Sequence, residues 1–302
     1  MADTKVMLGG LELKNPVIPA SGTFGYGREF AELFDLNILG GIAVKGTTID
    51  ARQGNDSPRI AEAAGGMINS VGLQNPGAAD VVSEQLPHLA EIFDGVIIAN
   101  ISGFSIEEYV SCAETMETCP QADIIEVNIS CPNVHGGGMA FGQSSSQAAA
   151  VTKAVKQVTD KPVYIKLSPN VTDVASIAAA CEEAGADGIS LINTLQAMRI
   201  DIKTRKPVLA NITGGLSGPA IFPVALRMVN QVRKSVDIPI IGMGGIASAE
   251  DVIEMIMAGA DAVQIGAAGL RNPWIYPEIT DRLPQLTEEL GINNLKEVKG
   301  IV

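Results

Sequence analysis

The stretch Ile124–Asn133, IIEVNISCPN, joins an apolar run to a turn of polar residues. In a parallel sheet covered on both faces, strand interiors are rich in Val and Ile, and polar residues appear where each strand emerges at its carboxyl end. Asn128, Cys131 and Asn133 would emerge there. We therefore predict a buried strand that ends at a reaction centre. The alternative interpretation, for Cys131 taken without its neighbours, is that it is a small hydrophobic residue buried in the core.

The same pattern recurs along the chain. Seven further short apolar runs end at Ser21, Lys45, Asn100, Lys166, Asn193, Gly244 and Gly266. Segments of helical periodicity lie between most of the runs, at 78–92, 106–118, 144–159, 174–184, 219–236 and 249–258. Alternating strands and helices specify a parallel sheet, and eight such units in about 250 residues favour a closed α/β (β/α)8 TIM barrel over an open Rossmann sheet.

The segments outside these units indicate additions to a single domain. The opening residues 7–16, MLGGLELKNP, are predicted to form a hairpin that plugs the bottom of the barrel. Residues 46–75 and 194–217 are long insertions, which we expect to form lids or binding surfaces at the carboxyl face. Because no shift in composition and no repeat marks a boundary, residues 1–302 are expected to form one catalytic domain.

Composition and charge exclude several classes of function. A formal net charge of -13 argues against a nucleic-acid or anionic-membrane surface. No apolar stretch approaches membrane-spanning length and no signal-peptide pattern is present, so we expect a cytoplasmic protein. The 4 cysteines lack C-x-x-C spacing, so neither a zinc site nor an iron-sulfur cluster is expected.

Three glycine-rich turns on the same rim indicate a phosphate ligand. They are GMGGI at 242–246, GAAG at 266–269 and GGLSGPAI at 214–221, where a third turn is expected to open a helix. Backbone N–H groups in such turns approach an anion closely, and barrels commonly bind phosphate after strands seven and eight. No G-x-G-x-x-G follows the first strand, so a dinucleotide bound in Rossmann fashion is not indicated.

Lysines and asparagines complete the predicted site. Lys45 and Lys166 each end an apolar strand, where their charge would face a ligand. The alternatives are a lysine that snorkels to water and a Schiff-base nucleophile, as in aldolases. A flavin or pyrimidine ligand is favoured by the amides of Asn69, Asn100, Asn128, Asn133 and Asn193, although single asparagines more commonly cap elements of the core. Amides present paired donors and acceptors that complement a flat ring of alternating C=O and N–H groups.

Five segments together resemble the dihydroorotate dehydrogenase family. They are ASGTFGYG at 20–27, KGTT at 45–48, GNDSPRIAEAAGGMINSVGLQNPG at 54–77, NISCPN at 128–133 and KLSPN at 166–170. Within the family the TFGYG and GNDSPRI segments are similar to class 1B catalytic subunits. The class 1A enzymes also use a catalytic cysteine, so Cys131 does not separate the two classes.

The resemblance implies oxidation of dihydroorotate to orotate in de novo UMP synthesis, with FMN in this chain. It further implies a partner subunit with FAD and a [2Fe-2S] cluster, which passes electrons to NAD in an α2β2 assembly. Four alternatives remain open: a fumarate-linked class 1A enzyme, a flavin barrel similar to dihydropyrimidine dehydrogenase, a non-flavin aldolase or isomerase, and a silent FMN-binding scaffold.

The resemblance also implies a role for individual residues. Cys131 would be the base that removes the C5 proton, Lys45 would bridge flavin and substrate, and Lys166 would lie near the flavin N1 and O2 edge. The implied substrate residues are Lys45, Asn69, Ser70, Val71, Gly72, Leu73, Asn128, Asn133, Asn193 and Thr194. The implied FMN residues are Ser21, Lys45, Gly46, Asn100, Asn128, Lys166, Ile192, Gly218, Gly244, Gly245, Gly266 and Ala267, and no metal ligand is expected.

Overall fold

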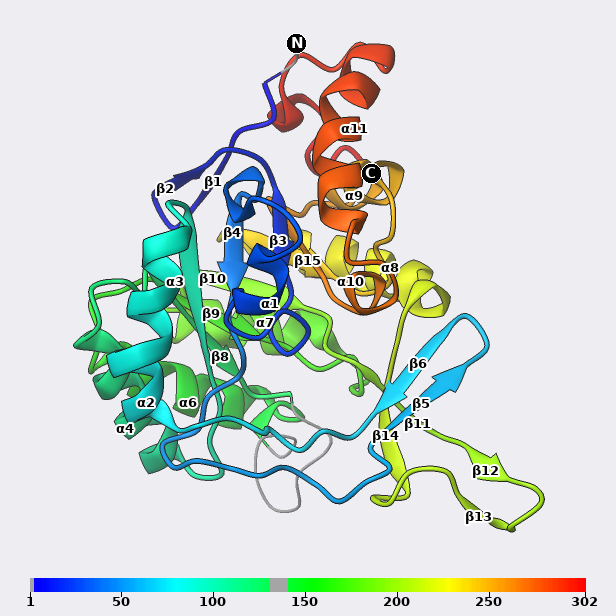
Figure 1. Ribbon diagram of the computed structural model, residues 1–302. Helices are drawn as coiled ribbons and strands as arrows, with labels where there is room; N and C mark the ends of the chain where they lie inside the picture. Colours follow the sequence, from blue (N-terminus) through cyan, green and yellow to red (C-terminus); the bar gives the residue numbers. More distant parts are fainter. Residues whose placement is uncertain (1–2, 131–140) are drawn as a thin grey trace.

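The computed structural model describes residues 3–130 and 141–302. In this part of the chain, eight parallel strands pair in the order β3–β16–β15–β10–β9–β8–β7–β4 (Figure 1). The Gly40 N–H also donates to the Val17 carbonyl at 3.0 Å, so β3 and β4 meet and the barrel is nearly closed. The strands are β3 (Val17–Pro19), β4 (Gly41–Ala43), β7 (Val96–Ile101), β8 (Ile124–Asn128), β9 (Val163–Lys166), β10 (Gly188–Leu191), β15 (Ile240–Met243) and β16 (Ala262–Ile265). All eight predicted strands and the barrel fold are confirmed.

Helices surround the barrel where helical periodicity predicted them. Ser105, Asp173 and Ser248 each cap a helix with a side-chain oxygen that accepts a backbone N–H three residues later. The helical elements are α1 (Arg28–Ala31), η1 (Leu36–Ile38), α2 (Ala78–Asp80), η2 (Val81–Gln85), α3 (Leu86–Ile92), α4 (Ile106–Glu117), α6 (Ser145–Lys156), α7 (Val174–Glu183), η3 (Pro219–Ile221), α8 (Phe222–Arg233), α9 (Ala249–Met257), α10 (Ala267–Arg271), α11 (Ile275–Glu289) and η4 (Leu295–Glu297).

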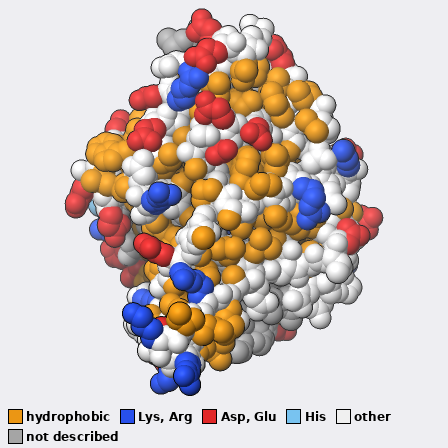
Figure 2. All heavy atoms as spheres, turned by 90° about the vertical axis from the view of Figure 1, so that its right-hand side faces the viewer, with side chains coloured by type: hydrophobic (Ala, Val, Ile, Leu, Met, Phe, Trp, Pro, Cys, Tyr) orange, Lys and Arg blue, Asp and Glu red, His pale blue; other side chains and the backbone are white. Residues whose placement is uncertain are grey.

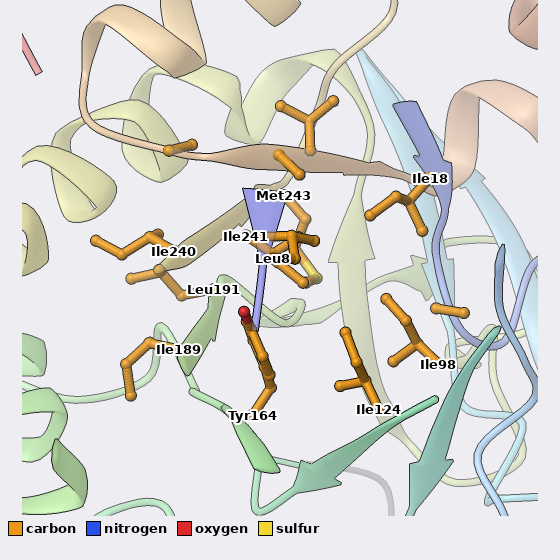
Figure 3. Packing of buried hydrophobic residues seen from close by; sticks show 14 of the residues in the cluster. Leu8, Ile18, Ile98, Ile124, Tyr164, Ile189, Leu191, Ile240, Ile241 and Met243 are labelled. Atoms are coloured by element: carbon orange, nitrogen blue, oxygen red, sulfur yellow. The ribbon is translucent and has the colours of Figure 1, made fainter. Parts of the chain in front are cut away.

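The predicted N-terminal hairpin closes the amino-terminal end of the barrel. Strands β1 (Val6–Leu8) and β2 (Leu11–Leu13) pair antiparallel. Leu8 is fully buried, and Figure 3 shows it beside Tyr164 and Ile241 of the barrel strands. Burial of this apolar surface removes it from water, which is the main favourable term in folding. The hairpin therefore completes the core at the end opposite the strand carboxyl termini.

The two insertions form strands as well as loops. Residues 46–75 contain β5 (Ile60–Ala63) and β6 (Gly66–Asn69), and residues 194–217 contain β11 (Leu195–Met198), β12 (Ile200–Asp201), β13 (Lys206–Pro207) and β14 (Thr213–Ser217). Within the described residues, an antiparallel sheet of order β11–β14–β6–β5 joins them beyond the strand carboxyl ends, at the lower right of Figure 1. These strands were not predicted from the sequence.

Two predicted glycine turns are wrong in part. In the turn predicted at 266–269, only Gly266 precedes α10, and residues 267–269 lie in that helix. The other is the turn predicted at 214–221. Gly214 and Gly215 lie in β14, and the turn itself is at Gly218, with φ 113°. A Cβ atom at Gly215 would lie 1.9 Å from Thr194 Oγ1, so this strand position requires glycine because its neighbour approaches so closely. No helix in the described parts of the chain is long and apolar enough to cross a membrane.

Candidate functional site

A cavity of about 950 Å³, open to solvent, lies at the carboxyl ends of the barrel strands. Most of the residues predicted from sequence lie in its wall. They are Ser21, Lys45, Gly46, Asn69, Leu73, Asn100, Asn128, Lys166, Ile192, Asn193, Thr194, Gly218, Gly244, Gly245, Gly266 and Ala267. The wall also contains residues that the sequence analysis did not single out, namely Ala20, Gly22, Thr23, Ser217, Ile221, Met243 and Gln264.

Three predicted substrate residues do not line this cavity. Ser70 is buried, and its Oγ accepts hydrogen bonds from Asn55 Nδ2 at 3.1 Å and Asn211 Nδ2 at 2.9 Å. The Val71 carbonyl accepts the Asn55 N–H at 2.9 Å. Ser70, Val71 and the adjacent Gly72 therefore hold the loop in place, while Asn69 and Leu73 on either side lie in the cavity wall. Substrate binding by the three stays a prediction.

The catalytic cysteine predicted at position 131, together with Asn133, lies outside the described residues. The segment that leads to it is firmly held. Ser130 Oγ donates to Asn128 Oδ1 at 2.8 Å and accepts from Asn193 Nδ2 at 2.7 Å. The Tyr109 hydroxyl donates to the Asn128 carbonyl at 2.8 Å. Strands β8 and β10 therefore end in one polar cluster, because the carboxyl ends of barrel strands share one face.

Lys166 and Lys45 both lie in the cavity wall, as predicted. Lys166 is only 4% exposed, and its Nζ donates to Ser21 Oγ at 3.0 Å. The same Nζ lies 3.6 Å from Glu126 Oε2, which gives the buried ammonium a counter-charge. Lys45 follows β4, where its backbone N–H donates to the Gly25 carbonyl at 3.0 Å. The cavity thus holds one cation from each of two strands.

Glu126 is a buried residue that the sequence analysis missed. It has no exposed surface, and its carboxylate accepts from Asn100 Nδ2 at 2.5 Å and from Gln264 Nε2 at 2.8 Å. Asn100, Lys166 and Gln264 come from three different strands and all line the cavity. The sequence could have indicated its role, because Glu126 interrupts an apolar run and lies two residues before Asn128. Residues two apart in a strand lie on the same face. Glu126 therefore connects side chains from three other strands at the floor of the cavity.

The carboxylate also fixes how two amides are oriented. A carboxylate only accepts, so Asn100 and Gln264 must both turn their NH2 groups toward Glu126. Asn100 Oδ1 and Gln264 Oε1 are left buried with no hydrogen-bond partner among the described residues. Buried acceptors without a partner are rare, and here they lie in residues of the cavity wall. They suit a bound group that carries N–H or O–H donors.

The predicted phosphate turns stand at the rim of the same cavity. Gly218, Gly244 and Gly245 have φ values of 113°, 124° and 83°. A Cβ atom at Gly245 would lie 2.7 Å from the backbone nitrogen of Phe222, so the turn backbone packs directly against the start of α8. Such turns offer backbone N–H groups to an anion without any basic patch.

The cavity wall therefore offers groups that suit the ring and the phosphate of FMN. Unpartnered amide oxygens suit the ring N–H, two lysines suit negative charge on the ring or the substrate, and the glycine turns suit the phosphate. Ile192, Leu73 and Met243 add apolar surface to the wall. No group of three or more His, Cys, Asp or Glu residues that could hold a metal ion occurs in the described parts of the chain.

Fold and cavity together define an α/β barrel with a ligand cavity at the carboxyl ends of its strands. The chain matches the dihydroorotate dehydrogenase family over residues 2–287. It therefore belongs to the dihydroorotate dehydrogenase family.

Three curated relatives carry the name "Dihydroorotate dehydrogenase B (NAD(+)), catalytic subunit". The protein of Bacillus cytotoxicus is 56% identical over 98% of this chain and 96% of its own length. The protein of Anoxybacillus flavithermus is 55% identical over 98% of this chain and 94% of its own length. The protein of a Geobacillus species is 56% identical over 98% of this chain and 94% of its own length. The sequence resemblance is thus confirmed at the level of the class B catalytic subunit.

Proposed function

We propose that this chain is the catalytic subunit of an NAD-linked dihydroorotate dehydrogenase, which oxidises dihydroorotate to orotate in pyrimidine biosynthesis. The observation that carries the proposal is the cavity floor, where the Glu126 carboxylate accepts from Asn100 and Gln264 and pairs with the Lys166 ammonium at 3.6 Å. This arrangement combines a buried cation with fixed amide acceptors, which suits FMN as the cofactor. When bound, FMN supplies the two-electron acceptor that no side chain can provide.

The chain's own residues would bind and deprotonate the substrate. Oxidation removes a proton from C5, and a hydrogen with two electrons from C6. Cys131 is the proposed base, and it directly follows the hydrogen-bonded Ser130. A thiol has an unperturbed pKa of about 8.5, so the reaction is expected to accelerate as the pH rises toward that value.

Substrate orientation is assigned to the polar cluster at the ends of β8 and β10. Asn128, Asn193 and Thr194 present amide and hydroxyl groups to the cavity. Thr194 N–H donates to Asn193 Oδ1 at 2.8 Å, which orients the Asn193 amide. Together with Lys45, these groups would hold the carboxylate and the ring amides of dihydroorotate. A site built to hydrogen-bond such groups rejects analogues that lack them.

Electrons must leave the chain after each turnover. We assign this step to a partner subunit with FAD and a [2Fe-2S] cluster, which reduces NAD in a cytoplasmic α2β2 enzyme. The relatives' description as catalytic subunits supports a second subunit, and four cysteines without cluster spacing support a redox centre outside this chain.

The test is the visible spectrum of the purified chain before and after anaerobic addition of dihydroorotate. We expect one non-covalent FMN per chain and loss of the flavin colour when dihydroorotate is added. A colourless protein that cannot be reconstituted with FMN, or release of FAD instead, would refute the cofactor. An FMN spectrum that dihydroorotate leaves unchanged would refute the activity and indicate a silent scaffold.

A further inference from the structure

A second cavity, of about 1410 Å³, lies beside the first between the β5–β6 hairpin and α10. We call it the hairpin groove. Its walls come from β5, β6, the start of η3, α10 and the start of α11, and most of its lining residues are apolar or glycine. Glu62 and Arg271 are its only charged residues among those described, in a chain of net charge -13. The groove is therefore nearly neutral within an acidic protein.

Large apolar side chains stand exposed at this groove. Ile60 is 53% exposed and Leu270 is 49% exposed, and both line it. Trp274, which lies in the chain between the groove residues Asn272 and Ile275, is also 49% exposed. Figure 2 shows the corresponding face of the molecule, where hydrophobic side chains gather across the middle and charged ones lie largely around them. Contiguous apolar surface of this kind marks an interaction site in a folded protein.

The groove is preformed and adjoins the cofactor cavity. Gly218 and Ala267 belong to the walls of both. The Ala220 N–H donates to the Gly65 carbonyl at 3.0 Å, and Ser217 pairs with Met67 across β14 and β6. These backbone contacts fix the hairpin, so an occupant would not have to order this wall first. Preorganisation lowers the cost of association.

We propose that the hairpin groove is the docking surface for the electron-accepting partner subunit, an inference that rests on the proposed function. Each turnover moves two electrons from dihydroorotate to NAD+, giving orotate, NADH and one proton. Electron transfer weakens steeply with distance, so the partner has to sit against a wall of the cofactor cavity. Within the described chain, the groove combines shared walls with exposed apolar anchors.

Another apolar region lies on the β11–β13 insertion and fits this role less well. Met198, Ile200 and Ile202 are exposed there. No residue of β11, β12 or β13 lines the cofactor cavity, whereas the hairpin groove shares Gly218 and Ala267 with it. A partner bound only at these strands would therefore share no wall with the cofactor cavity. The β11–β13 insertion therefore suits the electron-transfer contact less well than the hairpin groove does.

The test uses the FMN-loaded chain and the iron-sulfur flavoprotein subunit from the same organism. Leu270→Glu and Ile60→Glu place a charge in the groove, and Leu290→Glu is the matched control, because Leu290 is 53% exposed at the far end of α11. We expect each groove variant to weaken the Kd for the partner about tenfold or more, as loss of an interface anchor does. NAD-linked turnover should fall accordingly at limiting partner, while turnover with an artificial dye stays at the wild-type rate.

Salt provides a second readout. Because the groove is apolar, the wild-type Kd should change little when the ionic strength rises from about 0.1 M to about 1 M, which shortens the Debye length from about 10 Å to about 3 Å. Melting temperatures close to wild type would establish that the variants are folded.

Three results would overturn the docking proposal. They are wild-type partner affinity in both groove variants, an equal loss of affinity in Leu290→Glu, and a change only in self-association of the chain, which would make the groove an interface between copies. Failure of dihydroorotate to reduce the wild-type flavin would instead refute the proposed function, so the two failures are distinguishable.

Discussion

Replacement of Glu126 by glutamine is expected to disturb the polarity of the cavity floor while keeping its shape. The carboxylate accepts from Asn100 and Gln264 and lies 3.6 Å from the Lys166 ammonium. An introduced amide presents one NH2 group where the carboxylate presented only oxygens. The NH2 group of the new glutamine would therefore face the NH2 group of Asn100 or Gln264, and two donors cannot form a hydrogen bond. The partner amide would have to rotate by half a turn to present its oxygen instead. Such a rotation would reverse which end of the partner amide is available to FMN.

The magnitude follows from the contacts. Unit charges 3.6 Å apart attract by about 5 kcal/mol at an effective dielectric constant of about 20. Desolvation of each ion costs several kcal/mol in return, so the pair adds little net stability, but loss of one partner costs about 3–5 kcal/mol. Alanine at position 126 would incur that cost and create a cavity. Glutamine keeps the volume, and loss of one well-placed acceptor for FMN should weaken the FMN Kd about tenfold, equivalent to about 1.4 kcal/mol.

The assay is fluorescence titration of the apo chain with FMN, together with the flavin midpoint potential and the melting temperature. The potential should rise in Glu126→Gln, because the Lys166 charge is no longer offset and favours added electrons on the flavin. Glu254→Gln, at an exposed position of α9, is the matched control and should behave as wild type. An unchanged FMN Kd and an unchanged potential in a folded Glu126→Gln variant would refute this role for Glu126.

Four further outcomes are expected. Cys131→Ser should retain FMN but lose its colour slowly with dihydroorotate at neutral pH and recover at high pH, because a hydroxyl is a far weaker acid than a thiol; stopped-flow bleaching at wild-type rates near neutral pH would remove Cys131 from the mechanism. Anaerobic titration should show flavin reduction by dihydroorotate and not by dihydrouracil, since unpaired polar groups in the site penalise the analogue; equal reduction by both would favour the dihydropyrimidine dehydrogenase reading. Steady-state assays of the isolated chain should show turnover with artificial acceptors but not with NAD until the partner subunit is added, whereas efficient turnover with fumarate would move the assignment to class 1A. Burial raises the pKa of the Cys112 and Cys181 thiols to about 12, so mass spectrometry after alkylation of the native protein below that pH should find neither modified, and rapid modification of either would contradict their burial.

The sequence by itself determined the barrel and most of the residues that line the cavity. A buried parallel strand must be apolar along its length and polar where it emerges, so Lys45, Asn128 and Lys166 could be recognised from local pattern alone. Barrel closure then brings the strand ends to one face, which is why residues scattered through the sequence meet in one cavity. The family resemblance supplied the chemistry that this pattern left open.

Only the tertiary structure decided which long-range contacts complete the site. The sheet that joins β6 to β14 pairs segments from two separate insertions, and local periodicity carries no signal for such pairing. In the sequence, Glu126 is a single polar residue within an apolar strand. Its partners Asn100, Lys166 and Gln264 belong to other strands and are brought to it only by the fold. Ser70 turned out to hold a loop, because its neighbours Asn55 and Asn211 are set by the fold. Sequence specifies each element through its own burial pattern, whereas hydrogen-bond partners across the barrel depend on closure, which no short segment encodes.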